Sequence, residues 1–121
     1  MTDDLLQELC DQLGLTFAPQ DWGIENSDGA RVQEFIDYYN RRLAELHSTQ
    51  RFQLVELIVA SANDAMVEGS LDPALLSQLG RIAKSRHEAE SIVLDYWARL
   101  DDDLEEFPVA AVVRDARSGA Q

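Results

Sequence analysis

The side chains best suited to acid–base, nucleophilic or metal chemistry in this chain are two histidines, His47 and His87, and one cysteine, Cys10. Neither histidine has an acidic residue three positions before it, so the Glu-x-x-His pattern of di-iron bundles is missing, as are zinc-site patterns. No lysine or histidine adjoins Cys10 to favour its thiolate, which predicts a small core residue. Phosphate-binding glycine loops and the G-x-S-x-G elbow are also absent. We therefore expect a protein that is not an enzyme and holds no cofactor or metal, with both histidines at the surface or capping helices.

The densest run of acidic side chains lies near the C-terminal end of the chain. It consists of Asp101, Asp102, Asp103, Glu105 and Glu106. The run lacks the alternating ligands, central glycine and twelfth-position glutamate of an EF-hand loop, so it does not predict a calcium site. Two interpretations stay open, a solvated acidic turn and a docking surface for lysine and arginine. Trp97 and Phe107 flank the run, and an aromatic anchor ringed by charge is typical of a binding hot spot, although Trp97 could equally be a core residue.

A second, weaker set of candidate partner-binding acids lies on the middle helices. It consists of Glu34, Asp37 and Asp64. Asp64 falls in the most apolar stretch of the chain, where a buried carboxylate is costly unless it is paired. The alternative is that Asp64 faces outward beside Glu56 or Glu68.

The net charge is −13 on 121 residues, with 23 acidic and 10 basic side chains. Such an imbalance opposes compaction by self-repulsion, and a basic partner is the most economical reason to retain it. Nucleic acids and anionic lipids would be repelled, so neither is expected as a partner. The N-terminus has no secretory pattern and no apolar stretch is long enough to span a membrane, which favours the cytoplasm.

Helical periodicity dominates the chain, and the three prolines fall at plausible helix boundaries. The pattern predicts an all-α, single-domain bundle of about five helices over residues 1–115, with a short C-terminal extension. We expect the helices over 3–13, 32–46, 48–68, 73–83 and 85–100. Ala89, Ile92, Val93, Tyr96 and Leu100 form the apolar stripe expected for the last of these. Residues 15–29 are interpreted as a loop packed over the core, 107–113 as a short helix or strand, and 116–121 as a disordered tail.

Three groups of residues give the span 31–109 a resemblance to the small acidic immunity proteins of polymorphic bacterial toxin systems. They are residues 34–39, residues 56–65, and Tyr96-Trp97 together with the acidic run and Phe107-Pro108-Val109. The resemblance implies a stoichiometric inhibitor that binds a cognate toxin, blocks its active site or holds it inactive, and fills a basic cleft by mimicking phosphate charge.

We therefore expect an immunity protein that neutralises a toxin through an acidic face. The main rival is a helical adaptor, regulator or secretion chaperone for a different protein, which would expose a hydrophobic groove and self-associate. A small bundle enzyme or metal protein would need inward-facing carboxylates and histidines at spacings that the sequence lacks.

Overall fold

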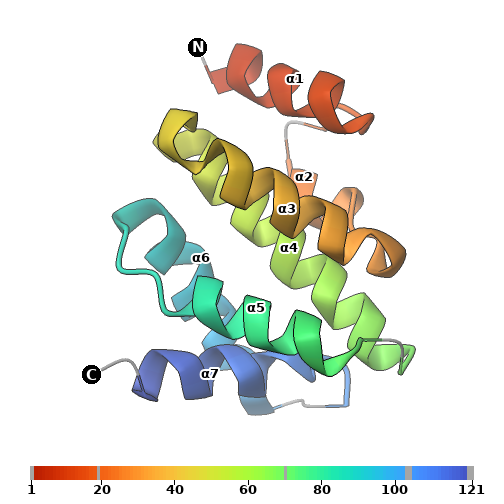
Figure 1. Cartoon of the computed structure of the whole chain (residues 1–121), viewed down its shortest axis with the longest axis vertical. Helices are drawn as coiled ribbons and strands as arrows, with labels where there is room; N and C mark the ends of the chain where they lie inside the picture. Colours follow the sequence, from red (N-terminus) through yellow and green to blue (C-terminus); the bar gives the residue numbers. More distant parts are fainter. Residues whose placement is uncertain (1, 19, 70, 103–104, 120–121) are drawn as a thin grey trace.

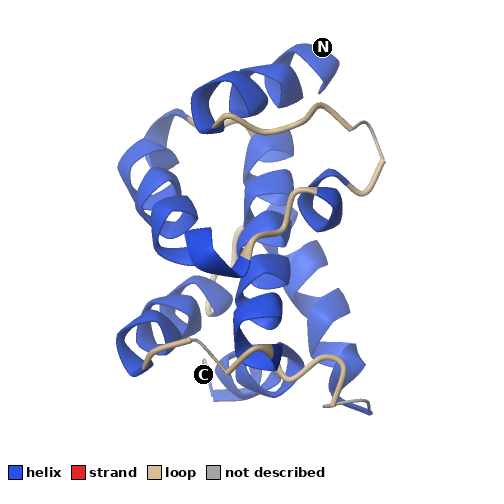
Figure 2. Ribbon diagram, turned by 90° about the vertical axis from the view of Figure 1, so that its right-hand side faces the viewer, coloured by secondary structure: helices blue, strands red, loops and turns tan. Residues whose placement is uncertain are grey.

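The computed structural model describes residues 2–18, 20–69, 71–102 and 105–119, and within them the chain is entirely helical and contains no strand (Figure 2). The all-α class is confirmed. The number of helices differs from the expectation, because the described residues form seven α-helices rather than about five, besides three short 3-10 segments. The α-helices are α1 (Thr2–Leu13), α2 (Trp22–Glu25), α3 (Val32–Arg42), α4 (Ser48–Val67), α5 (Pro73–Ala83), α6 (Glu88–Ala98) and α7 (Val109–Gly119).

The long helix α4 is the centre of the bundle and contacts all six other α-helices. Helices α1 and α7 lie at opposite ends of the long axis of the molecule (Figure 1). Six helices cannot all pack on one face of α4, so α4 is buried on more than one side. Its consecutive residues 57–60 are all buried. The most apolar stretch of the sequence therefore forms the central helix, with much of its length buried.

Local signals in the sequence set most helix ends. Asp72 accepts a hydrogen bond from the Leu75 amide and precedes Pro73, which is a favourable first helical residue. Gly14 and Gly69 follow α1 and α4 with φ of +66° and +73°, a left-handed conformation that glycine adopts without strain.

The loop expected over residues 15–29 contains the short helix α2, which sequence analysis did not predict. Trp22 is fully buried and its indole N–H donates to the Cys10 sulfur at 3.1 Å. Gly23 lies so close to α4 that a Cβ atom there would stand 2.8 Å from the Leu57 amide nitrogen. Tertiary packing against α4 therefore holds these four residues in a helix that is too short to be stable alone.

The C-terminal segment also differs from the expectation. Residues 116–119, assigned to a disordered tail that begins at residue 116, belong to α7. Ala116 is buried, and Arg117 donates to Asp95 at 3.1 Å, to Ser91 and to the Ser85 carbonyl oxygen. These contacts with α6 and with the segment before it extend the helix beyond the apolar stretch visible in the sequence.

Candidate functional site: an acidic groove beside α4 and α6

Three adjoining hollows form a groove along α4 and α6, which we call the α4–α6 groove. The Trp97 hollow, of about 370 Å³, includes Ile24, Asp64 and Phe107 in its lining. The Tyr96 hollow, of about 280 Å³, shares Ile24 with the first. The His87 hollow, of about 430 Å³, shares Phe52 and Ile92 with the second. The shared residues make the three hollows a continuous surface.

Exposed apolar side chains gather in this groove. The described residues include five large apolar side chains that are more than one-third exposed, and four of them line the groove: Ile24 (49%), Val67 (58%), Ile92 (58%) and Tyr96 (54%). The fifth, Phe17, lies outside it. Single exposed apolar residues are ordinary, whereas a contiguous group marks an interaction surface.

The charge of the groove is of one sign. Six carboxylates line it: Asp21, Glu56, Asp64, Glu68, Glu88 and Glu106. The described lining residues include no lysine or arginine. Burial, and then the negative charge of Asp21, raise the pKa of Glu56 above its usual range. The groove therefore places acidic side chains beside its exposed apolar side chains.

The structure brings some of the predicted site residues together and separates others. Trp97, Asp64 and Glu106 line the Trp97 hollow, although they come from α6, α4 and the segment before α7. Trp97 is only 4% exposed and forms part of the floor of the hollow, with its ring 6.0 Å from that of Phe107 in an edge-on arrangement. Asp64 is half-buried and accepts a hydrogen bond from the Ser27 hydroxyl at 2.7 Å.

The acidic run is only partly described. Asp101 and Asp102 belong to the 3-10 segment Arg99–Asp102, and Asp103 lies outside the described residues. Glu105 and Glu106 are exposed, and the Glu106 carbonyl oxygen accepts from the Asn63 side chain at 3.0 Å.

The second predicted set of acids does not join the groove. Glu34 and Asp37 line a separate hollow between α1 and α3, together with Arg41 and Arg42. Glu34 forms an ion pair with Arg31 at 2.7 Å, and this contact with Arg31 lowers the pKa of Glu34. Asp37 accepts from Gln33 at 2.8 Å. Glu34 therefore pairs with a basic residue of the chain, whereas Asp37 is hydrogen-bonded to a neutral amide, and both lie outside the α4–α6 groove.

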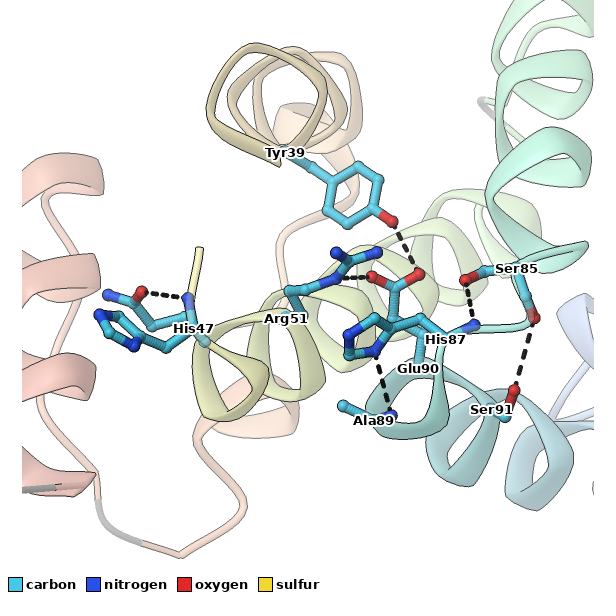
Figure 3. A network of polar contacts seen from close by, with 9 residues as sticks. Tyr39, His47, Arg51, Ser85, His87, Ala89, Glu90 and Ser91 are labelled. Atoms are coloured by element: carbon cyan, nitrogen blue, oxygen red, sulfur yellow. Dashed lines mark hydrogen bonds and ion pairs between the residues drawn. The ribbon is translucent and has the colours of Figure 1, made fainter. Parts of the chain in front are cut away.

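A buried charged network, which was not predicted from the sequence, positions α6, the helix that contributes Ile92 and Tyr96 to the groove. Glu90 of α6 is completely buried and accepts hydrogen bonds from the Tyr39 hydroxyl of α3, at 2.8 Å, and from Arg51 of α4 (Figure 3). Burial, and then the hydrogen bond to Glu90, raise the pKa of Tyr39 far above its usual value, so the hydroxyl remains a donor. This network fixes α6 against two other helices.

The histidines lie at helix starts, as capping residues do. His87 Nδ1 accepts from the Ala89 amide at 3.2 Å, so His87 caps α6. His47 precedes α4, and its amide donates to the Gln50 side chain at 3.0 Å. Among the described residues, no group of three or more His, Cys, Asp or Glu side chains is placed to hold a metal ion. Nor does that part of the chain contain a helix long and apolar enough to cross a membrane.

The protein is thus a small all-α helical bundle whose α4–α6 groove is lined by acidic and apolar side chains. Comparisons with known protein families, with curated proteins and with solved structures find no match to this chain.

Proposed function

We propose that this protein binds a basic protein through the α4–α6 groove, and that the partner is a bacterial toxin which it neutralises. The carrying observation is the coincidence, in one groove, of four exposed large apolar side chains and six carboxylates, with no lysine or arginine among the described lining residues. Apolar anchors surrounded by charge are typical of protein–protein interfaces.

The charge of the groove favours a positively charged partner surface. Complementary potentials speed the encounter of two proteins and reject like-charged competitors, while the desolvated apolar contacts set the dissociation rate. A toxin that acts on nucleotides or nucleic acids has a basic cleft of this kind. Occupation of that cleft by the groove region would exclude the substrate.

The resemblance to immunity proteins supports the choice of a toxin as the partner. Two of the three groups of residues that carry it contribute to the groove: Glu56 and Asp64 from one, and Tyr96, Trp97 and Phe107 from the other. These residues are separated in sequence and adjoin only in the folded chain.

An adaptor or secretion chaperone is the second candidate, and the exposed apolar groove is the feature that favours it. Such a protein would bind its partner without abolishing the activity of that partner. Binding and inhibition must therefore be measured separately.

The experiment pairs this protein with the protein encoded by the neighbouring open reading frame. Growth of cells that express the neighbour is measured with and without this chain, and affinity is measured with purified proteins. The groove variant Ile92→Ser/Tyr96→Ser should bind at least about 30-fold more weakly, because truncation of a central anchor costs 2 kcal/mol or more. The control Phe17→Ser removes an exposed apolar side chain outside the groove and should bind like the unaltered protein.

Each outcome has a defined meaning. Growth rescue that is lost with Ile92→Ser/Tyr96→Ser and kept with Phe17→Ser supports neutralisation through the groove. An association rate that falls with added salt supports the electrostatic part. Binding without rescue supports the adaptor function instead. A neighbour that does not bind, or that binds both variants equally well, contradicts the proposal.

A further inference from the structure

We infer that the part of the partner that docks in the α4–α6 groove is a single amphipathic α-helix, which carries lysine or arginine beside its apolar face and has its N-terminal end at the Trp97 hollow. This inference rests on the proposed function, because it names the segment of the partner that the groove would bind. It depends on the length of the groove, on its helical walls and on the polarity of its charge.

The groove is a channel between two helices that both pack against α4. The Tyr96 hollow has lining residues from all three: Ile24 from α2, Phe52 from α4 and Tyr96 from α6. Along α4, the lining residues of the three hollows extend from Ser48 to Glu68. At a rise of 1.5 Å per residue this distance is about 30 Å, which a docked helix of about 20 residues would match.

Exposed apolar side chains lie on both sides of this channel. Ile92 and Tyr96 are four residues apart on α6 and form one ridge, and Ile24 of α2 lines the same hollow. Val67 of α4 continues the apolar surface into the Trp97 hollow. An occupant that covers all of these side chains needs one long apolar face. A helix with apolar residues at intervals of three and four has such a face.

The walls of the groove favour a helix over an extended segment. Extended peptides commonly bind by adding a strand to a sheet edge, and the described residues contain no strand. The main-chain groups of α4 and α6 are paired within each helix. An extended segment pressed against the apolar side chains would therefore bury N–H and C=O groups without partners, which costs free energy. A docked helix pairs its own main-chain groups and buries only side chains.

The charge of the lining favours a basic helix and disfavours a second copy of this chain. Six carboxylates and no lysine or arginine occur among the described lining residues. Two copies joined groove to groove would bring these carboxylates together, and each copy carries a net charge of −13. Juxtaposed like charges oppose association, whereas lysine or arginine beside an apolar face meets opposite charge.

Helices α4 and α6 run in the same direction along the groove. Their first residues, Ser48 and Glu88, both line the His87 hollow. Val67, the last residue of α4, and Trp97, one residue before the end of α6, both line the Trp97 hollow. The negative C-terminal ends of both helix dipoles therefore lie at the Trp97 hollow, and the positive N-terminal ends lie at the His87 hollow.

The carboxylates follow the same polarity. Among the described residues, three carboxylates line the Trp97 hollow, two line the Tyr96 hollow and one lines the His87 hollow. A helix carries partial positive charge at its N-terminal end and partial negative charge at its C-terminal end. The carboxylates and the dipoles of α4 and α6 thus favour the same placement, in which the docked helix runs antiparallel to α4.

The probe is a synthetic peptide of about 20 residues, acetylated and amidated at its ends. Leucines recur at intervals of three and four residues, lysines flank the leucine face along the whole length, and alanines fill the outer face. The peptide is titrated into the ¹⁵N-labelled full chain and followed by NMR. The amide signals of Ile24, Val67 and Tyr96 should shift saturably below about 1 mM peptide, and that of Phe17 should stay in place. Absence of a saturable shift overturns the inference.

Two altered peptides test the helix and the charge separately. Replacement of two central outer-face alanines by proline interrupts the helix but keeps every leucine and lysine, and it should weaken binding at least about tenfold. Replacement of all lysines by glutamate keeps the leucine face and should also weaken binding at least about tenfold. Unchanged affinity of either altered peptide overturns the inference.

Variants of the protein test whether the peptide lies between both walls. Ile92→Ser/Tyr96→Ser alters the α6 wall and Ile24→Ser alters the α2 wall, and all three side chains are about half-exposed, so the fold should be retained. Each variant should weaken peptide binding at least about fivefold, whereas Phe17→Ser should not change it. A loss in only one wall, or in neither, contradicts a helix that lies between α2 and α6.

Spin labels on the peptide test its direction. A label at the N-terminal end should broaden the amide signals of Val67 and Glu106, which line the Trp97 hollow. A label at the C-terminal end should broaden those of Thr49 and Ala89, which line the His87 hollow. The reverse pattern, or equal broadening by both labels, overturns the antiparallel placement.

The same reagents separate this inference from the proposed function. If the neighbouring protein binds and loses affinity with Ile92→Ser/Tyr96→Ser, while the peptide gives no saturable shift, the helix inference is wrong and the groove proposal stands. If the peptide binds as described and the neighbouring protein does not bind, the groove is a receptor for a basic helix and the toxin proposal fails.

Discussion

Replacement of Glu90 by glutamine should destabilise the protein strongly, although it changes a single atom type. Glu90 has no exposed surface, and it accepts from the Tyr39 hydroxyl and from Arg51, whose side chain is 19% exposed. Glutamine keeps the shape but removes the charge, and its amide group places a donor where one of two donors now points. Loss of one partner from a buried ion pair typically costs 3–5 kcal/mol. Because Arg51 keeps some contact with water, we expect about 3 kcal/mol.

The assay is chemical unfolding followed by circular dichroism, with a double-mutant cycle over Glu90→Gln and Arg51→Gln. The coupling free energy of this pair should exceed about 1.5 kcal/mol, because each single change leaves a buried polar group without its partner. The surface pair Arg42–Glu45 is the matched control. Its atoms are 2.6 Å apart, but its side chains are 33% and 67% exposed, so its coupling should stay below about 1 kcal/mol.

The cycle tests whether burial, rather than short distance, gives the Glu90 network its strength. Equal coupling in the two pairs would refute that reasoning, as would a loss of less than about 1 kcal/mol in Glu90→Gln. The result matters for the groove, because Ile92 and Tyr96 lie on the same helix as Glu90 and face the opposite way.

Two further predictions concern the contact of α2 with α4, and Gly80→Ala in α5 is the comparison for the first of them. Gly23→Ala should lower the unfolding free energy by about 1–3 kcal/mol in thermal or chemical unfolding, because its Cβ would collide with the Leu57 amide; Gly80→Ala, where the added methyl group meets no atom within 4 Å, should instead stabilise the protein by about 0.5–1 kcal/mol. Glu56→Gln should stabilise the protein at pH 7, since the raised pKa of Glu56 means that its ionised form is disfavoured in the folded state. The folded protein then binds more protons than the unfolded chain, so stability from this group is lost as pH rises, and the advantage of Glu56→Gln should disappear at pH values below both pKa values. A gain of equal size at pH 4 and pH 7 would contradict this.

The helices could be predicted from the sequence where capping residues and apolar periodicity indicate the same segment. Asp72-Pro73 marks the start of α5, and Gly14 and Gly69 mark the ends of α1 and α4, through capping and backbone conformations that act within a few residues. Helix α2 was missed because its stability comes from the burial of Trp22 and the close approach of Gly23 to α4. Packing against a distant helix leaves no pattern in the four residues Trp22–Glu25 that would predict it.

The orientation of α6 was predicted wrongly, and the error concealed both the groove and the buried network. The predicted stripe contained Ile92 and Tyr96, which are exposed. The buried face instead contains Glu90, Val93, Leu94 and Trp97, at spacings of three, four and seven from Glu90. Large apolar residues occur on both sides of this helix, so periodicity alone allows either stripe. A glutamate at a core position was the available signal, and it becomes interpretable only when Arg51 and Tyr39 are known to lie nearby.

The distribution of charge, rather than its total, is the argument for a docking surface. Four acids form ion pairs with arginines of the same chain: Glu34, Glu45, Glu90 and Asp95. Two further arginines, Arg41 and Arg81, line other hollows. The α4–α6 groove contains six of the 23 acidic side chains, and these six surround the exposed apolar side chains. Separation of this kind destabilises the free protein by repulsion, and a basic partner relieves the repulsion when it binds. Neutralisation of groove acids should thus raise the stability of the free protein while it weakens the complex.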